Sequence, residues 1–208
     1  MRVESFVKPI ALFLAVALGF GMSIGCRRPA ARATPTTDCT PVYDAGLVAK
    51  QIQENDDPQF FAAFQEPPLY AMPACIDEAY SLTWIPSFHA PVLVQVWRSG
   101  NRYFMVGKSL DSKGWSKPGN IKETNARALT PFEWRDWTDA LNRASYWSMT
   151  STANELSPND GAVWLIDGLR AKEYHWVRRR VPDEQFGELA KHLIRLSGLE
   201  TAHALYLP

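Results

Sequence analysis

The residues best suited to acid–base chemistry are two of the four histidines, His89 and His175. Histidine exchanges a proton near neutral pH, and a carboxylate such as Asp160 or Asp167 could orient its ring. This set predicts a small envelope hydrolase if the segment around His89 lies beside the strand that carries His175. The alternative for His175 is a hydrogen-bonded structural role, because aliphatic residues neighbour it in the predicted strand pair.

No metal site or cofactor is predicted. The sequence contains no H-E-x-x-H, Walker phosphate loop, G-x-G-x-x-G or C-x-x-C pattern. Cys39 and Cys75 are isolated, whereas the cysteines of zinc sites come in close pairs. The first interpretation is therefore a binding, interaction or structural module, with the histidine-based hydrolase as the alternative.

The charge balance argues against nucleic acid as a partner. Lysine plus arginine number 22 and aspartate plus glutamate number 22, so neither sign is in excess. Of the 208 residues, 46% are apolar and 12% aromatic, which is ordinary for a globular protein with one core.

Residues 1–25 predict an export signal. Two basic residues precede the apolar run Ile10 to Phe20, which is shorter than the roughly 20 residues that a membrane-spanning helix needs. Ser23-Ile24-Gly25-Cys26 resembles the lipobox of bacterial lipoproteins, and this resemblance implies acylation of Cys26 and a membrane anchor. Cleavage after Ala33 is the alternative, and it would release a soluble periplasmic or secreted protein.

The residues after Cys26 extend this interpretation. Arg27 resembles the sorting pattern of Gram-negative lipoproteins, which implies the periplasmic side of the outer membrane. Residues 26–41 are rich in Pro, Ala and Thr and predict a flexible tether, followed by a single domain over residues 42–208. Cys39 and Cys75 are predicted to form a disulfide in an oxidising compartment, worth about 3–4 kcal/mol in the chain-entropy model.

The clearest strand pair is predicted within residues 160–182. Ala162 to Ile166 and Glu173 to Arg178 alternate bulky with smaller or polar residues, as strands of a half-buried sheet do. A three-residue loop would pair Trp164 with Trp176, and a four-residue loop would pair Trp164 with Val177. Either register places His175 opposite an aliphatic residue.

Three more strands are predicted earlier in the chain. Glu78 to Ile85 presents alternate apolar residues on one face, and Val92 to Trp97 is the most β-prone run of the sequence. A tight turn at Gly100-Asn101 predicts that Trp97 pairs with Phe104, and Val96 with Met105, on the next strand.

The segment Leu110 to Ala128 is polar and predicts a long loop or an edge excursion. Trp115 within it is predicted to be a lid over the sheet, with contact to an envelope glycan as the alternative. Most of the other tryptophans have the spacing of core residues.

Two main helices are predicted. One begins at Thr130-Pro131-Phe132-Glu133, a capping box, and carries a core stripe at Trp134, Trp137, Leu141 and Ala144. The other begins near Pro182-Asp183 and ends at Gly198, with His192 expected in solvent. Short N-terminal helices are expected after Asp44 and at Pro58. The predicted fold is α+β: an antiparallel sheet of about four to five strands packed with two main helices.

Three segments carry a family resemblance. Ser87 to Pro91, Thr130 to Trp134, and Asp160 to Trp164 with its continuation Tyr174 to Arg179 resemble a widespread family of uncharacterised bacterial exported proteins and lipoproteins. The resemblance covers about Tyr80 to Leu199. It implies a compartment but no activity.

Overall fold

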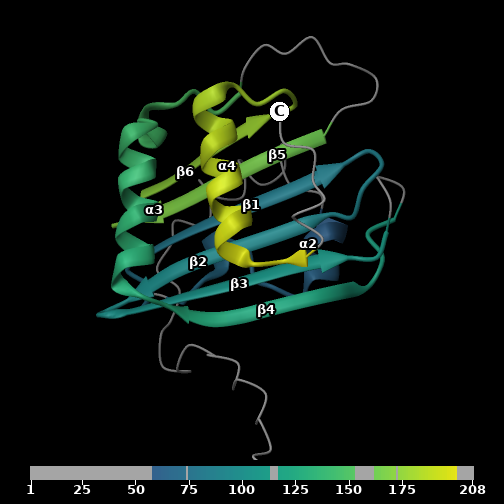
Figure 1. The fold of residues 1–208 in the computed structure, drawn as a ribbon, viewed down its shortest axis with the longest axis horizontal. Coiled ribbons are helices and arrows are strands. Elements are labelled where there is room, and N and C mark those ends of the chain that lie inside the picture. The colour runs from purple at the N-terminus through teal and green to yellow at the C-terminus, as the bar shows by residue number, and fades with distance from the viewer. Residues whose placement is uncertain (1–57, 74, 113–116, 153–161, 172, 201–208) are drawn as a thin grey trace, which may run out of the picture.

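The computed structural model describes residues 58–73, 75–112, 117–152, 162–171 and 173–200. They form an antiparallel six-stranded sheet in the order β4-β3-β2-β1-β5-β6, with helices on both faces (Figure 1). The strands are β1 (Glu78–Pro86), β2 (Val92–Ser99), β3 (Arg102–Leu110), β4 (Ile121–Leu129), β5 (Ala162–Arg170) and β6 (Glu173–Arg179). The helices are α2 (Pro58–Phe64), α3 (Pro131–Arg143) and α4 (Glu184–Ser197), with 3-10 turns η1 (Leu69–Ala71) and η2 (Tyr146–Ser148). The α+β prediction is confirmed, but the sheet has six strands where four to five were expected.

The strand that the sequence did not predict is β4. It lies at one edge of the sheet and pairs with β3. Its side chains alternate between half-buried and exposed, and polar residues occur on both faces, so no apolar alternation marks it in the sequence. The prediction of a long loop or an edge excursion over Leu110 to Ala128 is therefore wrong from Ile121 onward, where the chain forms a regular edge strand.

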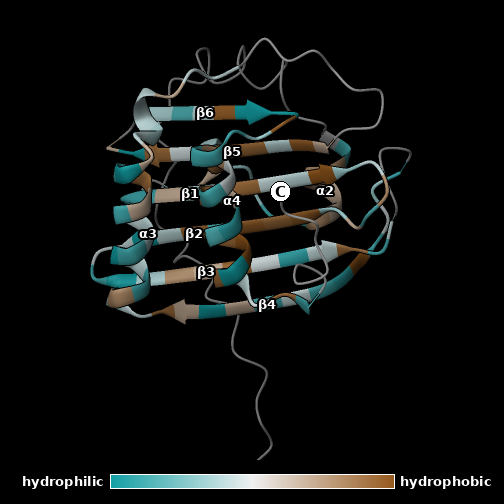
Figure 2. Cartoon of the chain, turned by 45° about the horizontal axis from the view of Figure 1, so that its top comes forward, coloured by the Kyte–Doolittle hydropathy of each residue, from teal (hydrophilic) through white to brown (hydrophobic). Residues whose placement is uncertain are grey.

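The main core lies between the sheet and the helices α3 and α4, which cover the same face (Figure 1). Tyr80, Leu82 and Trp84 of β1 share this face, as their spacing predicts. The helices bury Trp134, Trp137, Leu141, Phe186, Leu189 and Leu193 against them. Each large apolar side chain that is fully buried contributes roughly 1.5–3 kcal/mol. Figure 2 shows the corresponding pattern, with apolar colouring in the central strands and polar colouring on the outer side of α3.

The opposite face is covered in part by α2 and η1. Phe60 and Phe64 of α2 pack against Ile85, Leu93 and Leu110. Beneath the end of α2, the Lys108 ammonium lies 2.7 Å from a Glu66 carboxylate oxygen and donates to the Phe64 carbonyl at 2.6 Å. Strand β1 is consequently buried along its whole length.

The hairpin between β2 and β3 has the predicted register. Val96 pairs with Met105 and Trp97 with Phe104, around a turn in which Gly100 has a φ of 58°. The rings of Trp97 and Phe104 stack with centroids 5.5 Å apart. A two-residue turn with a glycine at positive φ explains why the sequence predicts this register correctly.

The hairpin between β5 and β6 has a register that differs from both predicted ones. Trp164 pairs with Arg179, and His175 lies opposite Gly168 where an aliphatic residue was expected. The strand continues through Gly168, and the chain reverses after Arg170. A Cβ atom at residue 168 would lie 2.8 Å from Tyr146 Cε1, so glycine serves here for close packing within a strand.

The ends of both main helices are as predicted. The Thr130 hydroxyl accepts from the Glu133 amide, and the Glu133 carboxylate accepts from the Thr130 amide, which completes the capping box. Asp183 caps the start of α4, and Gly198 ends it with a φ of 62°. The predicted helix start at Pro58 is confirmed by α2, and the helix expected after Asp44 lies outside the described residues.

Candidate functional site

The surface is hollowed between the end of α3 and the start of α4. This α3–α4 groove has a volume of about 460 Å³. It is lined by Ala140, Arg143, Ala144, Glu184, Gln185, Glu188, Leu189, His192 and Arg195. The two helices run antiparallel, since the start of α3 meets the end of α4 through the Glu133, Arg127 and Leu196 contacts. Their chain directions therefore bring the last turn of α3 beside the first turns of α4.

The walls of the groove are charged and its floor is apolar. Leu189 and Ala144 are buried at the floor, whereas Arg143, Glu184 and Arg195 are exposed. Arg143 forms no ion pair with any described residue. Such an arrangement can bind a polar partner that carries charges of both signs, with apolar contact at the floor.

Glu188 is the most engaged acidic residue of the groove. Its carboxylate lies 2.9 Å from the Lys191 ammonium and 3.9 Å from the Arg195 guanidinium. The hydrogen bond from Lys191 lowers the pKa of Glu188. Glu188 therefore keeps its charge more readily than a free glutamate, close to the exposed Arg195 guanidinium.

His192 forms the inner end of the groove and corrects a prediction. The sequence suggested a solvated side chain, but only 17% of it is exposed, and its ring lies 5.6 Å from that of Trp137. Burial lowers the pKa of His192, and the nearby Asp136 carboxylate, 3.6 Å from Nε2, opposes this shift without reversing it. His192 is therefore neutral at neutral pH and can both donate and accept a hydrogen bond.

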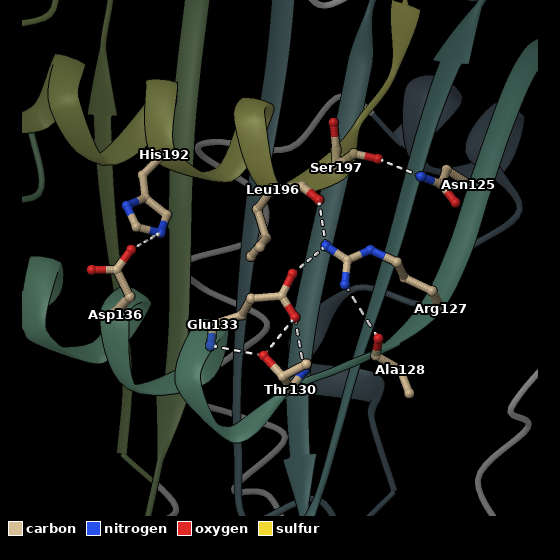
Figure 3. Close-up of polar contacts among 9 residues, drawn as sticks. All are labelled: Asn125, Arg127, Ala128, Thr130, Glu133, Asp136, His192, Leu196 and Ser197. Carbon is tan, nitrogen blue, oxygen red and sulfur yellow. Dashed lines mark hydrogen bonds and ion pairs between the residues drawn. The ribbon is translucent and has the colours of Figure 1, made fainter.

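A polar network holds α3 and α4 in place over β4 (Figure 3). The Arg127 guanidinium lies 2.7 Å from the Glu133 carboxylate and donates to the Leu196 carbonyl at 3.2 Å. Asn125 donates to the Ser197 carbonyl at 2.8 Å. A cation at the end of α4 and an anion at the start of α3 each suit the helix dipole they meet. The hydrogen bond from Arg127 is the largest of the effects that lower the pKa of Glu133 to about 2.

The structure places His175 in an aromatic cluster. Its ring centroid lies 5.2 Å from that of Tyr146 and 5.9 Å from that of Trp147, and the Arg170 guanidinium covers Trp147 at 4.5 Å. Burial lowers the pKa of His175, although the Tyr146 and Met149 backbone favours the protonated form. The charge of Glu173 acts in the same direction as these backbone groups and raises the pKa of His175, but burial has the larger effect.

The histidines and Asp167 are not brought together. His175 lies level with Tyr80, whereas His89 follows the far end of β1 and is exposed. From Tyr80 to the end of β1 is about 20 Å at 3.3 Å per residue. Asp167 points to the opposite face of the sheet from His175, because it lies opposite Trp176, the neighbour of His175. Its carboxylate accepts from the Tyr174 hydroxyl at 2.5 Å.

Several predicted site residues lie outside the described residues: Cys26, Cys39, Asp160 and Trp115. Cys75 lies just before β1, and its disulfide with Cys39 stays a prediction. Within the described ranges, no group of three His, Cys, Asp or Glu side chains is arranged to hold a metal ion. Among those same residues, no helix is long and apolar enough to cross a membrane.

The groove residues were missed because no motif marks them. A signal is nevertheless present, since Glu184, Glu188, His192 and Arg195 follow one another at spacings of four, four and three along one helix. That spacing places them on one face of α4. Their relation to Arg143 depends on how α3 packs, which the sequence does not specify.

No family model, curated protein or solved structure matches this chain. The resemblance to exported bacterial proteins therefore stays a prediction.

Proposed function

We propose that this protein is exported to the bacterial envelope, anchored there by a lipid on Cys26, and binds a partner protein in the α3–α4 groove. The observation that carries the binding role is the groove itself, with exposed charges of both signs above an apolar floor. The export signal, the lipobox-like Ser23-Ile24-Gly25-Cys26 and the tether predicted after it support the location. A tether would let the groove reach partners away from the membrane surface.

A protein segment fits the groove better than a glycan does. Glycan sites commonly present an aromatic ring on which a sugar can stack, and the lining holds no Trp, Tyr or Phe. Exposed Arg143 and Glu184 instead suit the acidic and basic side chains of a polypeptide. The hydrolase alternative gains no support from His175 and Asp167, which lie on opposite faces of the sheet.

Site-specific photocrosslinking in cells tests the proposal. A photoreactive residue at Gln185, exposed in the groove, is expected to yield a protein adduct. The same residue at Phe88, which is 66% exposed in the segment between β1 and β2, serves as the control position. Arg143→Glu in the Gln185 background should abolish the adduct, whereas Lys117→Glu, away from the groove, should leave it unchanged.

The outcomes separate the alternatives. An adduct that is equally strong from Phe88, or that survives Arg143→Glu, would contradict docking in the groove. An adduct that disappears after digestion of peptidoglycan would show that the partner is a glycan and not a protein. Absence of any adduct at Gln185 under conditions that crosslink a known envelope pair would remove the binding role.

A further inference from the structure

Among the described residues, one edge of the sheet has a further segment paired to it and the other has none. At β6, the amide of Arg178 donates to the Ser151 carbonyl at 2.7 Å, and Thr152 forms a parallel bridge with Arg178. At β4, Thr124 and Ala126 form no backbone hydrogen bond outside the pairing with β3, within the part of the chain that the structure describes. Thr124, Ala126 and Ala128 are exposed. An uncovered edge strand is a template for pairing with another strand.

The register of the hairpin shows which backbone groups point outward. A two-residue turn is closed by a hydrogen-bonded pair, here Ser99 and Arg102, and such pairs alternate along antiparallel strands. Phe104 and Val106 therefore bond toward β2, and Met105 and Gly107 toward β4. Continued across the next pair of strands, this alternation directs the amides and carbonyls of Thr124 and Ala126 away from β3. The Ala128 carbonyl has the same direction, and it accepts from the Arg127 guanidinium at 3.3 Å.

We propose that β4 pairs with β4 of a second copy of this chain, antiparallel and centred on Asn125, to join two sheets into one of twelve strands. In this register Thr124 pairs with Ala126 of the other copy, and both residues have outward backbone groups, as a hydrogen-bonded pair requires. Asn125 meets its own equivalent on the twofold axis. The contact is isologous, the common form in dimers.

Charge complementarity selects this register. Glu123 and Arg127 lie on the same face of β4 on either side of Asn125, so the centred register places each opposite the other in the second copy. These are the pairs without direct backbone hydrogen bonds, in which side chains approach most closely. The guanidinium of Arg127 already donates to Glu133, Leu196 and Ala128, and its remaining N–H donors can serve a second carboxylate. The Glu123 carboxylate accepts from the Glu200 amide at 2.8 Å, and a carboxylate can accept further hydrogen bonds.

The neighbouring registers are less favourable. Centring the pair on Thr124 would place Arg127 opposite Ile121 and Glu123 opposite Asn125. Centring it on Ala126 would place Glu123 opposite Leu129. Both shifts shorten the overlap of the two strands and remove the reciprocal ion pairs. The face away from α4 presents Thr124, Ala126 and Ala128, whose small side chains leave room for a second strand.

Disulfide trapping with the full-length protein in its membranes tests the arrangement. Asn125→Cys is expected to form a crosslinked dimer under mild oxidation, because the two copies of residue 125 face each other. Phe88→Cys, at a more exposed position in the segment between β1 and β2, should not. Thr124→Cys should crosslink far less than Asn125→Cys, since the two copies of residue 124 lie diagonally across the pair.

A second variant guards against damage to the fold, because Asn125→Cys removes the hydrogen bond to Ser197. Ala126→Pro deletes an outward amide, which an edge strand tolerates. Sedimentation of the detergent-extracted protein should show a dimer that Ala126→Pro converts to a monomer, with an unchanged circular dichroism spectrum. A wild-type monomer at all concentrations, a dimer that resists Ala126→Pro, or trapping of Asn125→Cys only to another protein would overturn the proposal.

Discussion

Arg127 on β4 and Glu133 in the first turn of α3 lie 2.7 Å apart, and the same arginine donates to the Leu196 carbonyl at the end of α4. One side chain thus joins a strand and two helices (Figure 3). The pair has measurable consequences for stability, because Glu133 has a pKa of about 2 in the folded protein against an ordinary value of 4.5.

The pH dependence of this pair gives the first prediction. A depressed folded-state pKa stabilises the protein above pH 4.5, and the contribution is lost as the pH falls toward 2. Glu133→Gln keeps a capping-box residue but removes the charge, so it should lower the free energy of unfolding at pH 7 by about 1 kcal/mol. Urea denaturation at pH 7 and pH 3 should show the difference from wild type shrinking at the lower pH. Asp139→Asn, exposed on the same helix, is the control and should change neither value.

Gly168 gives a prediction about packing. Gly168→Ala would place a Cβ atom 2.8 Å from Tyr146 Cε1 and 3.1 Å from Tyr80 Cε1, so unfolding should become easier by about 1–3 kcal/mol. Gly187→Ala is the matched control, since its Cβ would meet only Pro182 at 3.8 Å and alanine favours the helix by up to about 1 kcal/mol. Thermal unfolding should therefore show a lower Tm for Gly168→Ala and a higher Tm for Gly187→Ala. Equal effects would contradict the close packing at Gly168.

His175 gives a second prediction about pH. Like Glu133, it should make the protein less stable as the pH falls, but in a different pH range. Burial lowers its folded pKa below 6.5, so its contribution is present above pH 6.5 and is lost as the pH falls below that value. His175→Gln should reduce the loss of stability on acidification, whereas His89→Gln, at an exposed position, should not. An NMR titration of the His175 ring signals would measure the pKa directly. A value at or above 6.5 would be inconsistent with the buried position.

The buried pair of Lys108 and Glu66 predicts strong destabilisation when one partner is removed. Lys108→Met leaves Glu66, whose side chain is 13% exposed, without its cation, and should lower the free energy of unfolding by about 3 kcal/mol. Adding Glu66→Leu should recover most of that loss, because two apolar side chains replace an ion pair at low cost. Chemical denaturation of the two variants tests this. Additive losses would show that the residues do not act as a pair.

The lipidation proposed for Cys26 predicts that Cys26→Ser changes the compartment in which the protein is found. Cells labelled with an alkyne fatty acid should incorporate it into the wild-type protein and not into Cys26→Ser. Fractionation should then find the variant outside the membrane pellet. An unlabelled wild-type protein that begins at Thr34 by mass spectrometry would instead establish release after Ala33.

The sequence predicts the elements whose signals are local, and the structure differs where signals depend on distant packing. Thr130 and Gly198 mark helix ends through bonds within a few residues, so both predictions are confirmed. The turn after Arg170 could not be placed, because Gly168 acts through contact with Tyr146 and not through a turn of its own. His192 was expected in solvent because nothing near it in the sequence indicates that Trp137 packs against its ring.

The strand order also has a kinetic consequence. β1 to β4 follow one another as neighbours, as do β5 and β6. β1 and β5 pair along their whole length, although β2, β3, β4 and α3 separate them in the chain. Local hairpins can form early, whereas this central pair must wait until a long loop has closed. Folding should therefore be limited by the meeting of β1 and β5, and a ribosome must release the chain through β6 before the sheet can be completed.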